Sequence, residues 1–215
     1  LPGYTGTDVR GYFQQRFSVP CAVMNDAYAA ALGEGAYGAA RGHEDYLCIT
    51  YGTGIGGGMF LNGSAYYGKG GSANPMIGGL ILHPEQHTAS DPFSGTYERC
   101  ASTTALVALA QKADPDMTNG RKIFTAIGRP EIRAALEQWL DEVAAGLLSL
   151  LHVTNVPCLI LGGGILEQPL VLAGIQERVR ILAIPGFENV VIRSAELGNK
   201  AGLYGALANA RKQLA

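Results

Sequence analysis

The sequence is poor in charge, and the charges that it has are not gathered into runs. Charged residues make up 16% of the 215 residues, and the formal net charge is −2 at pH 7. Binding to a nucleic acid favours a basic stretch, or basic residues interleaved with aromatic ones, and neither pattern occurs. No apolar run reaches the length of a membrane span, and no signal-peptide pattern opens the chain. We therefore expect no nucleic-acid partner and no membrane partner for this segment.

Cysteine is also scarce, and metal-binding patterns are weak. The four cysteines are scattered without a C-x-x-C pair: Cys21, Cys48, Cys100 and Cys158. This distribution is typical of free thiols in a reducing compartment, so we expect a cytoplasmic protein. His83 and His87 have the H-x3-H spacing, but Pro84 disfavours the helix that would bring them together. We therefore expect two exposed loop histidines and no metal site.

Apolar sequence, by contrast, is plentiful. Hydrophobic residues make up 47% of the chain, which is enough to bury the core of one or two small domains. The first residue is Leu1, and the opening LPGYTG resembles the interior of a protein. We therefore expect that a further part of the protein precedes it.

The most informative stretch is rich in glycine. Residues 46–51 are apolar and β-rich, residues 52–58 contain five glycines, and residues 59–62 again favour a strand. This pattern predicts a tight hairpin over residues 52–58 whose turn exposes backbone N–H groups. Several such groups can bind an anion, most often a phosphate. An ordinary glycine-rich hairpin explains this stretch equally well.

Asn25 and Asp26 lie between a predicted short strand, residues 21–24, and a predicted alanine-rich helix, residues 27–40. Capping of that helix is the ordinary explanation for the pair. A carboxylate at the end of a strand in an α/β sheet also faces the crevice where ligands bind. In that position Asp26 could act as a general base toward a substrate hydroxyl.

The rest of the pattern predicts an α/β chain. We expect helices over residues 7–17, 97–110, 121–127, 131–153, from 167 onward and 201–214, and strands over residues 64–67, 77–82, 157–161 and 189–193, with loops over 68–79 and 83–95. The strand over residues 157–161 also ends in glycines: Gly162, Gly163 and Gly164. Glycine turns at the ends of strands in α/β sheets are common nucleotide sites.

Five stretches, in this order, carry a resemblance to a known family. They are NDA (25–27) with AAALGE (29–34), the glycine hairpin with LNG (61–63), ASTTAL (101–106), LGGGI (161–165), and LGN (197–199) with AGLYG (201–205). Together they resemble the ROK family (repressors, open reading frames and kinases) of the sugar kinase–actin superfamily. The resemblance implies an α/β, ribonuclease H-like (actin/sugar kinase-like) fold. Residues 1–45 would end a small lobe, residues 46–199 would form a large lobe that binds ATP and sugar, and residues 200–215 a C-terminal helix.

The resemblance also implies an activity, the transfer of the γ-phosphate of ATP to a hydroxyl of a hexose-like sugar with Mg²⁺ as cofactor. Asp26 resembles the catalytic base of the family, and Asn25 and Glu98 resemble its sugar-binding residues. The other expected site residues match the second phosphate loop and the turn beside the adenosine: Gly52, Thr53 and Gly54, then Gly162, Gly163 and Gly164. The implied partners are ATP and a small-molecule sugar, and homodimers are common in the family.

The chain departs from the family pattern in two ways. The opening strand with its Asp-Ile-Gly-Gly-Thr phosphate loop is absent, so the resemblance implies the end of the small lobe plus a complete large lobe. Residues 74–79 (NPMIGG) stand where many members have Gly-Glu-Ile-Gly-His, and residues 94–98 (SGTYE) replace their cysteine cluster. These differences imply a member without zinc. They also remove two sugar contacts, which leaves open a non-catalytic sugar-sensing domain of a transcriptional regulator.

Overall fold

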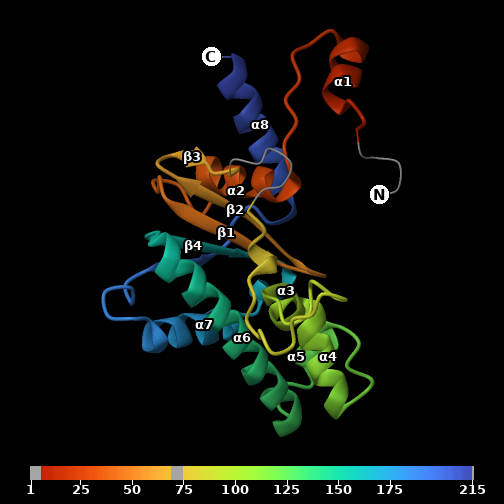
Figure 1. Ribbon diagram of the computed structural model, residues 1–215, viewed down its shortest axis with the longest axis vertical. Helices are drawn as coiled ribbons and strands as arrows, with labels where there is room; N and C mark the ends of the chain where they lie inside the picture. The colour runs from red at the N-terminus through yellow and green to blue at the C-terminus, as the bar shows by residue number, and fades with distance from the viewer. Residues whose placement is uncertain (1–5, 69–74, 215) are drawn as a thin grey trace.

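The computed structural model describes residues 6–68 and 75–214, and it shows a five-stranded mixed sheet between two layers of helices (Figure 1). The helices are α1 (Val9–Phe17), α2 (Asp26–Tyr37), α3 (Tyr97–Ala101), α4 (Thr103–Ala113), α5 (Gly120–Thr125), α6 (Pro130–Thr154), α7 (Pro169–Leu182) and α8 (Ala201–Leu214). The strands are β1 (Tyr46–Tyr51), β2 (Ile55–Leu61), β3 (Ser64–Ala65), β4 (Cys158–Gly162) and β5 (Val191–Ser194), and the short 3-10 helices are η1 (Ile77–Gly79), η2 (Gly164–Glu167) and η3 (Gly198–Lys200).

The order of the strands places three carboxyl ends at one edge of the sheet. The order is β3-β2-β1-β4-β5, in which β1 pairs with β4 and β4 with β5 in parallel, while β2 runs antiparallel to β1. Thr50 lies opposite Gly162, and Leu161 lies opposite Ser194, so β1, β4 and β5 end close to one another. In α/β sheets this is the edge at which ligands bind.

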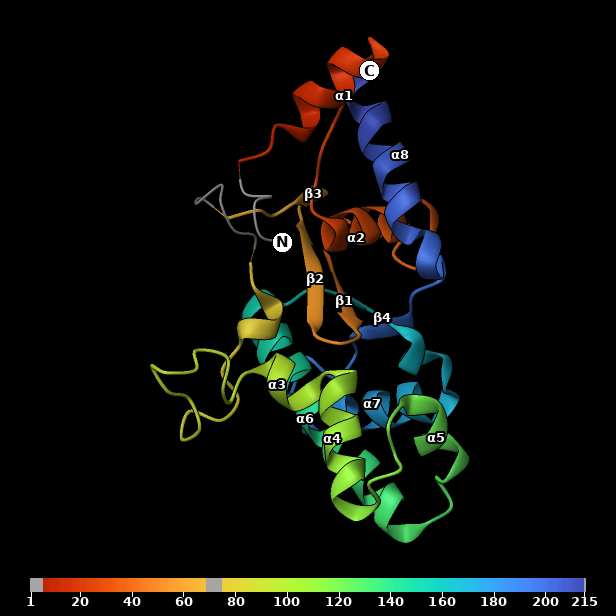
Figure 2. The ribbon, with the colours of Figure 1, turned by 90° about the vertical axis from the view of Figure 1, so that its right-hand side faces the viewer.

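Side chains alternate between the two faces of the sheet, and each face is buried under helices. In β1, Leu47 and Ile49 face the larger core, which the buried side of α6 completes, while Tyr46 and Cys48 face a smaller core under α2 and α8. Figure 2 shows α2 and α8 on one side of the sheet and α3, α4, α6 and α7 on the other. Burial on both faces explains why β1 and β4 are continuous apolar runs.

Helices α2 and α8 pack with their backbones in contact. A Cβ atom on Gly33 would collide with the carbonyl oxygen of Ala201, and one on Gly205 would collide with that of Ala29. Glycine at both positions therefore permits the approach. Because α2, α8 and the sheet share one apolar cluster, these three parts form one packed unit. The division into lobes at residues 45 and 199 stays a prediction.

The long helix and the β1, β4 and β5 strands follow the predictions closely, but three expected strands differ. Residues 21–24 form no strand, because a strand requires a paired neighbour and this segment does not join the sheet. Of the strand expected over residues 77–82, the first three residues form η1 instead, and the rest has only an isolated bridge between Ile81 and Thr96. The strand expected over residues 64–67 is limited to Ser64–Ala65.

The glycine hairpin is shorter than predicted, since β2 begins at Ile55 and only residues 52–54 form the turn. Gly57 and Gly58 lie inside the strand. A Cβ atom on Gly57 would lie 2.6 Å from the carbonyl oxygen of Cys48, and one on Gly58 would lie 2.7 Å from Cβ of Ala31. These two glycines serve close packing on the sheet rather than the turn.

The helix predicted over residues 97–110 is two helices, broken at Ser102. The hydroxyl of Ser102 accepts from the amide of Ala105 (3.2 Å) and so caps α4, while its carbonyl accepts from Nε1 of buried Trp139 (2.9 Å). The start of α4 is thereby fixed to α6.

Helix α1 stands apart from the sheet in both ribbon views (Figures 1 and 2), and none of its residues is buried. Among the described residues, no helix combines the length and the apolar character needed to cross a membrane.

Candidate active site

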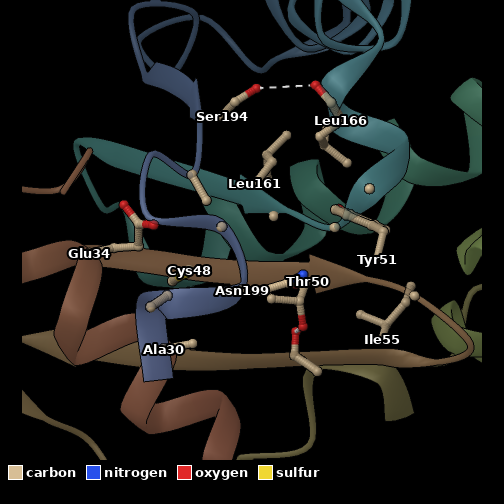
Figure 3. Close-up of a pocket in the computed structure, with 18 of the residues that line it drawn as sticks. Ala30, Glu34, Cys48, Thr50, Tyr51, Ile55, Leu161, Leu166, Ser194 and Asn199 are labelled. Atoms are coloured by element: carbon tan, nitrogen blue, oxygen red, sulfur yellow. Dashed lines mark hydrogen bonds between the residues drawn. The ribbon is translucent and has the colours of Figure 1, made fainter. Parts of the chain in front are cut away.

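Both glycine turns line one cavity at the edge where β1, β4 and β5 end. The cavity has a volume of about 820 Å³, and all six expected nucleotide-binding positions contribute to its wall: Gly52, Thr53, Gly54, Gly162, Gly163 and Gly164. Figure 3 shows Thr50 and Tyr51 of β1, Ser194 of β5 and Asn199 of η3 around the same space. The fold thus brings together two turns that lie far apart in the sequence.

The first turn is held from one side by the start of α4. The amide of Thr103 donates to the carbonyl of Gly52 (3.0 Å), and its hydroxyl donates to the carbonyl of Tyr51 (3.3 Å). The hydroxyl of Thr104 donates to the carbonyl of Thr53 (2.8 Å). Three successive carbonyl groups, from the last residue of β1 to Thr53, therefore point toward α4.

The amides of the turn consequently point the other way, because the C=O and N–H of a trans peptide lie on opposite sides. The amide of Gly52 donates to the carbonyl of Gly54 (3.0 Å), which closes the turn. Within the described part of the chain, the amides of Thr53 and Gly54 donate no hydrogen bond. Two adjacent donors of this kind at a cavity wall suit an anion such as a phosphate.

The second turn follows β4 and depends on Gly163. Its φ angle is +111°, and a Cβ atom there would collide with the carbonyl oxygen of Tyr51. By contrast, a Cβ atom on Gly164 would meet nothing within 4 Å. Gly163 therefore lets the second turn lie directly against the end of β1.

Glu98 of α3 lies beside the first turn, where its Oε2 accepts from the amide of Ile55 (3.0 Å). The carboxylate lines the cavity and is partly buried. A Cβ atom on Gly54 would collide with this Oε2, so glycine at position 54 makes room for the carboxylate. Of the two expected sugar-binding residues, Glu98 is the one that the structure places in the cavity wall.

Asn25 and Asp26 lie at the start of α2 and are exposed. The side chain of Asn25 accepts from the amides of Ala27 (3.0 Å) and Tyr28 (3.2 Å), so the capping interpretation is confirmed for Asn25. Neither residue lines the cavity, but Ala30 does. Asp26 lies on the same side of α2 as Ala30, about 6 Å further along the helix axis.

Sequence reasoning gave Glu34 no role, yet this buried carboxylate fixes one wall of the cavity. It accepts from the amides of Ala39 (2.8 Å), Glu196 (3.1 Å) and Leu197 (2.8 Å). The last two bonds attach the segment between β5 and η3 to α2. This segment leads directly to Asn199 in the cavity wall. No local sequence signal could reveal the contacts with Glu196 and Leu197, because these two residues are remote from Glu34 in the chain.

Cys48 also lines the cavity. Burial above all, with the nearby Glu34 and Cys158, raises the pKa of this thiol to about 12. The thiol stays protonated near neutral pH and is unsuited to act as a nucleophile.

A second cavity of about 880 Å³ lies on the α4 side of the first turn. It shares Gly52, Thr53 and Gly164 with the first cavity, and Arg121 of α5 adds a guanidinium to its wall. The first turn therefore lies between the two cavities. The wall of the second cavity contains a cationic side chain, Arg121, that the sequence pattern did not single out.

The two histidines of the H-x3-H pair have different environments. His87 is exposed, as expected, and its Nδ1 lies 3.0 Å from the carbonyl oxygen of Ser94. The expectation for His83 was wrong: its side chain is only 31% exposed, and its Nε2 lies 2.9 Å from Oε2 of Glu142 in α6. The long helix covers this part of the loop, which local sequence does not indicate.

The arrangement of sheet, turns and helices is that of an actin-like sugar kinase fold. The ROK hexokinase of Thermus thermophilus superposes with a TM-score of 0.86 at 32% identity, over 96% of this chain and 72% of the hexokinase. The ROK family glucokinase of Streptomyces griseus, in complex with glucose and AMPPNP, has a TM-score of 0.78 at 32% identity, over 94% of this chain and 72% of the enzyme.

The sequence comparisons agree with the structural ones. The model of the ROK family matches residues 2–213, and the glucokinase of Streptomyces coelicolor is 32% identical over 93% of this chain and 69% of its own length. The chain belongs to the ROK family. Its relatives also include a regulator, the xylose repressor of Bacillus spizizenii, which is 28% identical over 92% of this chain and 52% of the repressor.

Proposed function

We propose that the protein is an ATP-dependent kinase that phosphorylates a hydroxyl group of a hexose-like sugar. The observation that carries this proposal is the meeting of the two glycine turns in one cavity, beside Glu98, at the carboxyl ends of three parallel strands. Phosphoryl transfer needs positioned phosphates, a positioned hydroxyl and a base, and little other chemistry from the protein. The kinases among the relatives support the same assignment.

The nucleotide would lie across the two turns. The amides of Thr53 and Gly54 would bind phosphate oxygens, and the turn at residues 162–164 would lie beside the adenosine. Two observations support this orientation. The amides of Thr53 and Gly54 donate no hydrogen bond within the described residues and point away from α4, and the Streptomyces griseus glucokinase is in complex with AMPPNP, an ATP analogue.

Asp26 would act as the general base, and Asn25 and Glu98 would bind the sugar. As the sugar oxygen bonds to the γ-phosphorus and the bond from phosphorus to the bridging oxygen breaks, the hydroxyl proton passes to the carboxylate of Asp26, and ADP leaves. The position of Asp26, one helical turn beyond Ala30 in the cavity wall, supports this role.

Mg²⁺ fits this site through carboxylate and phosphate oxygens, its usual ligands. Glu34 and Glu98 are both bonded to backbone amides, whereas Glu167, an exposed residue, lines both cavities. Glu167 would therefore share the ion with the phosphates, and Mg²⁺ would neutralise charge that develops on them.

A sugar-sensing domain of a transcriptional regulator is the alternative. It is favoured by Met76 and Gly79, which stand where many members of the family have the Glu and His of Gly-Glu-Ile-Gly-His. The presence of a regulator, the xylose repressor, among the relatives also supports this alternative.

Release of ADP from Mg·ATP distinguishes the two functions. We expect turnover with one sugar of a hexose panel, and a loss of at least about 100-fold in kcat for Asp26→Asn, because general-base catalysis contributes roughly that much. The assay uses protein that includes any sequence upstream of Leu1.

Asp8→Asn is the matched control, since Asp8 is also a carboxylate at the start of a helix, in α1. Its turnover should equal that of the unchanged protein. Nucleotide binding without ADP release for any sugar would overturn the kinase proposal, and equal turnover in Asp26→Asn would overturn the role of Asp26.

A further inference from the structure

Three side chains from distant parts of the chain meet on the α6 side of the sheet. His83 comes from the loop after η1, Cys100 from α3 and Glu142 from α6, and their donor atoms all lie within 4.8 Å of one another. All three are partly buried, and none of them lines either of the large cavities. The cluster is therefore separate from the proposed active site.

The imidazole of His83 is held at both nitrogens. Its Nε2 lies 3.0 and 2.9 Å from the two oxygens of Glu142, and its Nδ1 lies 3.1 Å from Oε1 of Glu85. A histidine that binds a metal through one nitrogen usually donates the other N–H to a carboxylate, a backbone carbonyl or water. When Nε2 of His83 faces the metal, the carboxylate of Glu85 is the group that accepts from Nδ1.

An ion pair between His83 and the two carboxylates is the ordinary explanation. The hydrogen bond to Glu142 raises the pKa of His83, as such a pair should. The pair does not account for Cys100, whose thiol lies within 4.8 Å of the donor atoms of both His83 and Glu142. A divalent cation would compensate the negative charges of Glu142, Glu85 and a Cys100 thiolate together.

We propose that His83, Cys100 and Glu142 form a three-ligand site for a divalent transition-metal ion of the zinc class. Nitrogen, sulfur and carboxylate oxygen are the donors that Zn²⁺ binds in proteins, and a catalytic or partly open site typically has three of them. Metal–ligand bonds of about 2.0–2.3 Å place neighbouring donors roughly 3–4 Å apart, so side-chain shifts of about 1 Å complete the site.

The charges and protons balance in this arrangement. His83 loses the proton on Nε2 and Cys100 loses its thiol proton, both to solvent, while the carboxylate of Glu142 exchanges its contact with His83 for a bond to the ion. The ion with one thiolate and one carboxylate is then neutral. His83 keeps the proton on Nδ1, which it donates to Glu85.

The bound ion would join the loop, α3 and α6. Because Glu98 lies two residues before Cys100 in α3, the ion would steady the helix that presents Glu98 to the cavity. The sequence pattern does not indicate this site, since these ligands have no familiar spacing in the chain.

Titration of the metal-free chain with Co²⁺ and with Zn²⁺ tests the site. We expect one ion per chain, with a thiolate-to-cobalt charge-transfer absorption that Zn²⁺ abolishes by displacement, and a higher unfolding temperature with Zn²⁺. Cys100→Ser should remove the absorption and weaken Zn²⁺ binding at least about 100-fold. Glu85→Gln should keep the absorption but weaken binding about 10-fold, because it acts only through His83.

The matched controls are Cys21→Ser and His87→Gln, which remove a partly buried thiol and a loop histidine outside the cluster. Both should bind like the unchanged chain. Cys100→Ser that unfolds at the same temperature as the unchanged metal-free chain excludes misfolding as the cause. Absence of the charge-transfer absorption, or unchanged Zn²⁺ affinity in Cys100→Ser, would overturn the proposal.

Discussion

Gly163 shows how a single residue shapes the candidate site. Its φ of +111° is disfavoured for residues with a Cβ atom, and a Cβ there would also collide with the carbonyl of Tyr51 at the end of β1. We expect Gly163→Ala to lower the free energy of unfolding by about 2 kcal/mol and to weaken nucleotide binding, because the second turn must move away from β1.

Urea unfolding measures this effect, and Gly164→Ala is the control at the next position. A Cβ on Gly164 meets nothing within 4 Å, so its free energy of unfolding should change by no more than about 0.5 kcal/mol. Equal effects of the two substitutions would show that the contact with Tyr51 does not determine the role of Gly163.

Local chemistry at the residue scale was partly readable from sequence. Asn25 caps α2, as residue type and position predict. The environments of Glu34 and His83 were not readable, because their partners, Leu197 and Glu142, are remote in the chain. The catalytic role of Asp26 stays a prediction.

At the scale of elements, the contact between α2 and α8 depends on glycine at the crossing. Gly205 lies against the carbonyl of Ala29, so Gly205→Ala forces the two helices apart. We expect a loss of about 3 kcal/mol in the free energy of unfolding, as for an overpacked core. Because α8 follows η3, the wall of the cavity near Asn199 should shift as well.

Gly202→Ala in the same helix provides the comparison. A Cβ on Gly202 meets nothing within 4 Å, and alanine favours a helix by up to about 1 kcal/mol, so this variant should be as stable as the unchanged chain or more stable. Thermal and urea unfolding of both variants measure the difference. If Gly205→Ala also stabilises the chain, the close crossing is not a constraint.

At the scale of the whole molecule, ligands that bind across the two turns should stabilise the fold. Under the kinase proposal, AMPPNP at about 100 times its Kd should add about 2.7 kcal/mol to the free energy of unfolding. Adenosine at the same concentration should add much less, because it lacks the phosphates that the amides of Thr53 and Gly54 would bind.

Thermal unfolding with each ligand, at constant ionic strength, measures the contrast. Stabilisation by a sugar without any by AMPPNP would favour the sugar sensor instead. Equal stabilisation by adenosine and AMPPNP would contradict the phosphate-binding role of the first turn. A cytoplasmic location and a homodimer stay predictions at this scale.

The family, the central strands β1 and β4 and the long helix α6 were all predictable from the amino-acid sequence. These elements are encoded locally, in apolar runs, in glycines that follow a strand, and in apolar residues spaced three and four apart. Expected strands such as residues 21–24 failed, because a strand exists only where a partner is available to pair with it.

Which residues these local elements bring together depends on how the elements pack in three dimensions. The parallel pairing of β1, β4 and β5 places both glycine turns in one cavity, Glu34 fixes its wall, and the packing of α3 on α6 gathers His83, Cys100 and Glu142. Contacts between residues that are remote in the chain arise from the packing of whole elements, and neither spacing nor residue type in one stretch records them.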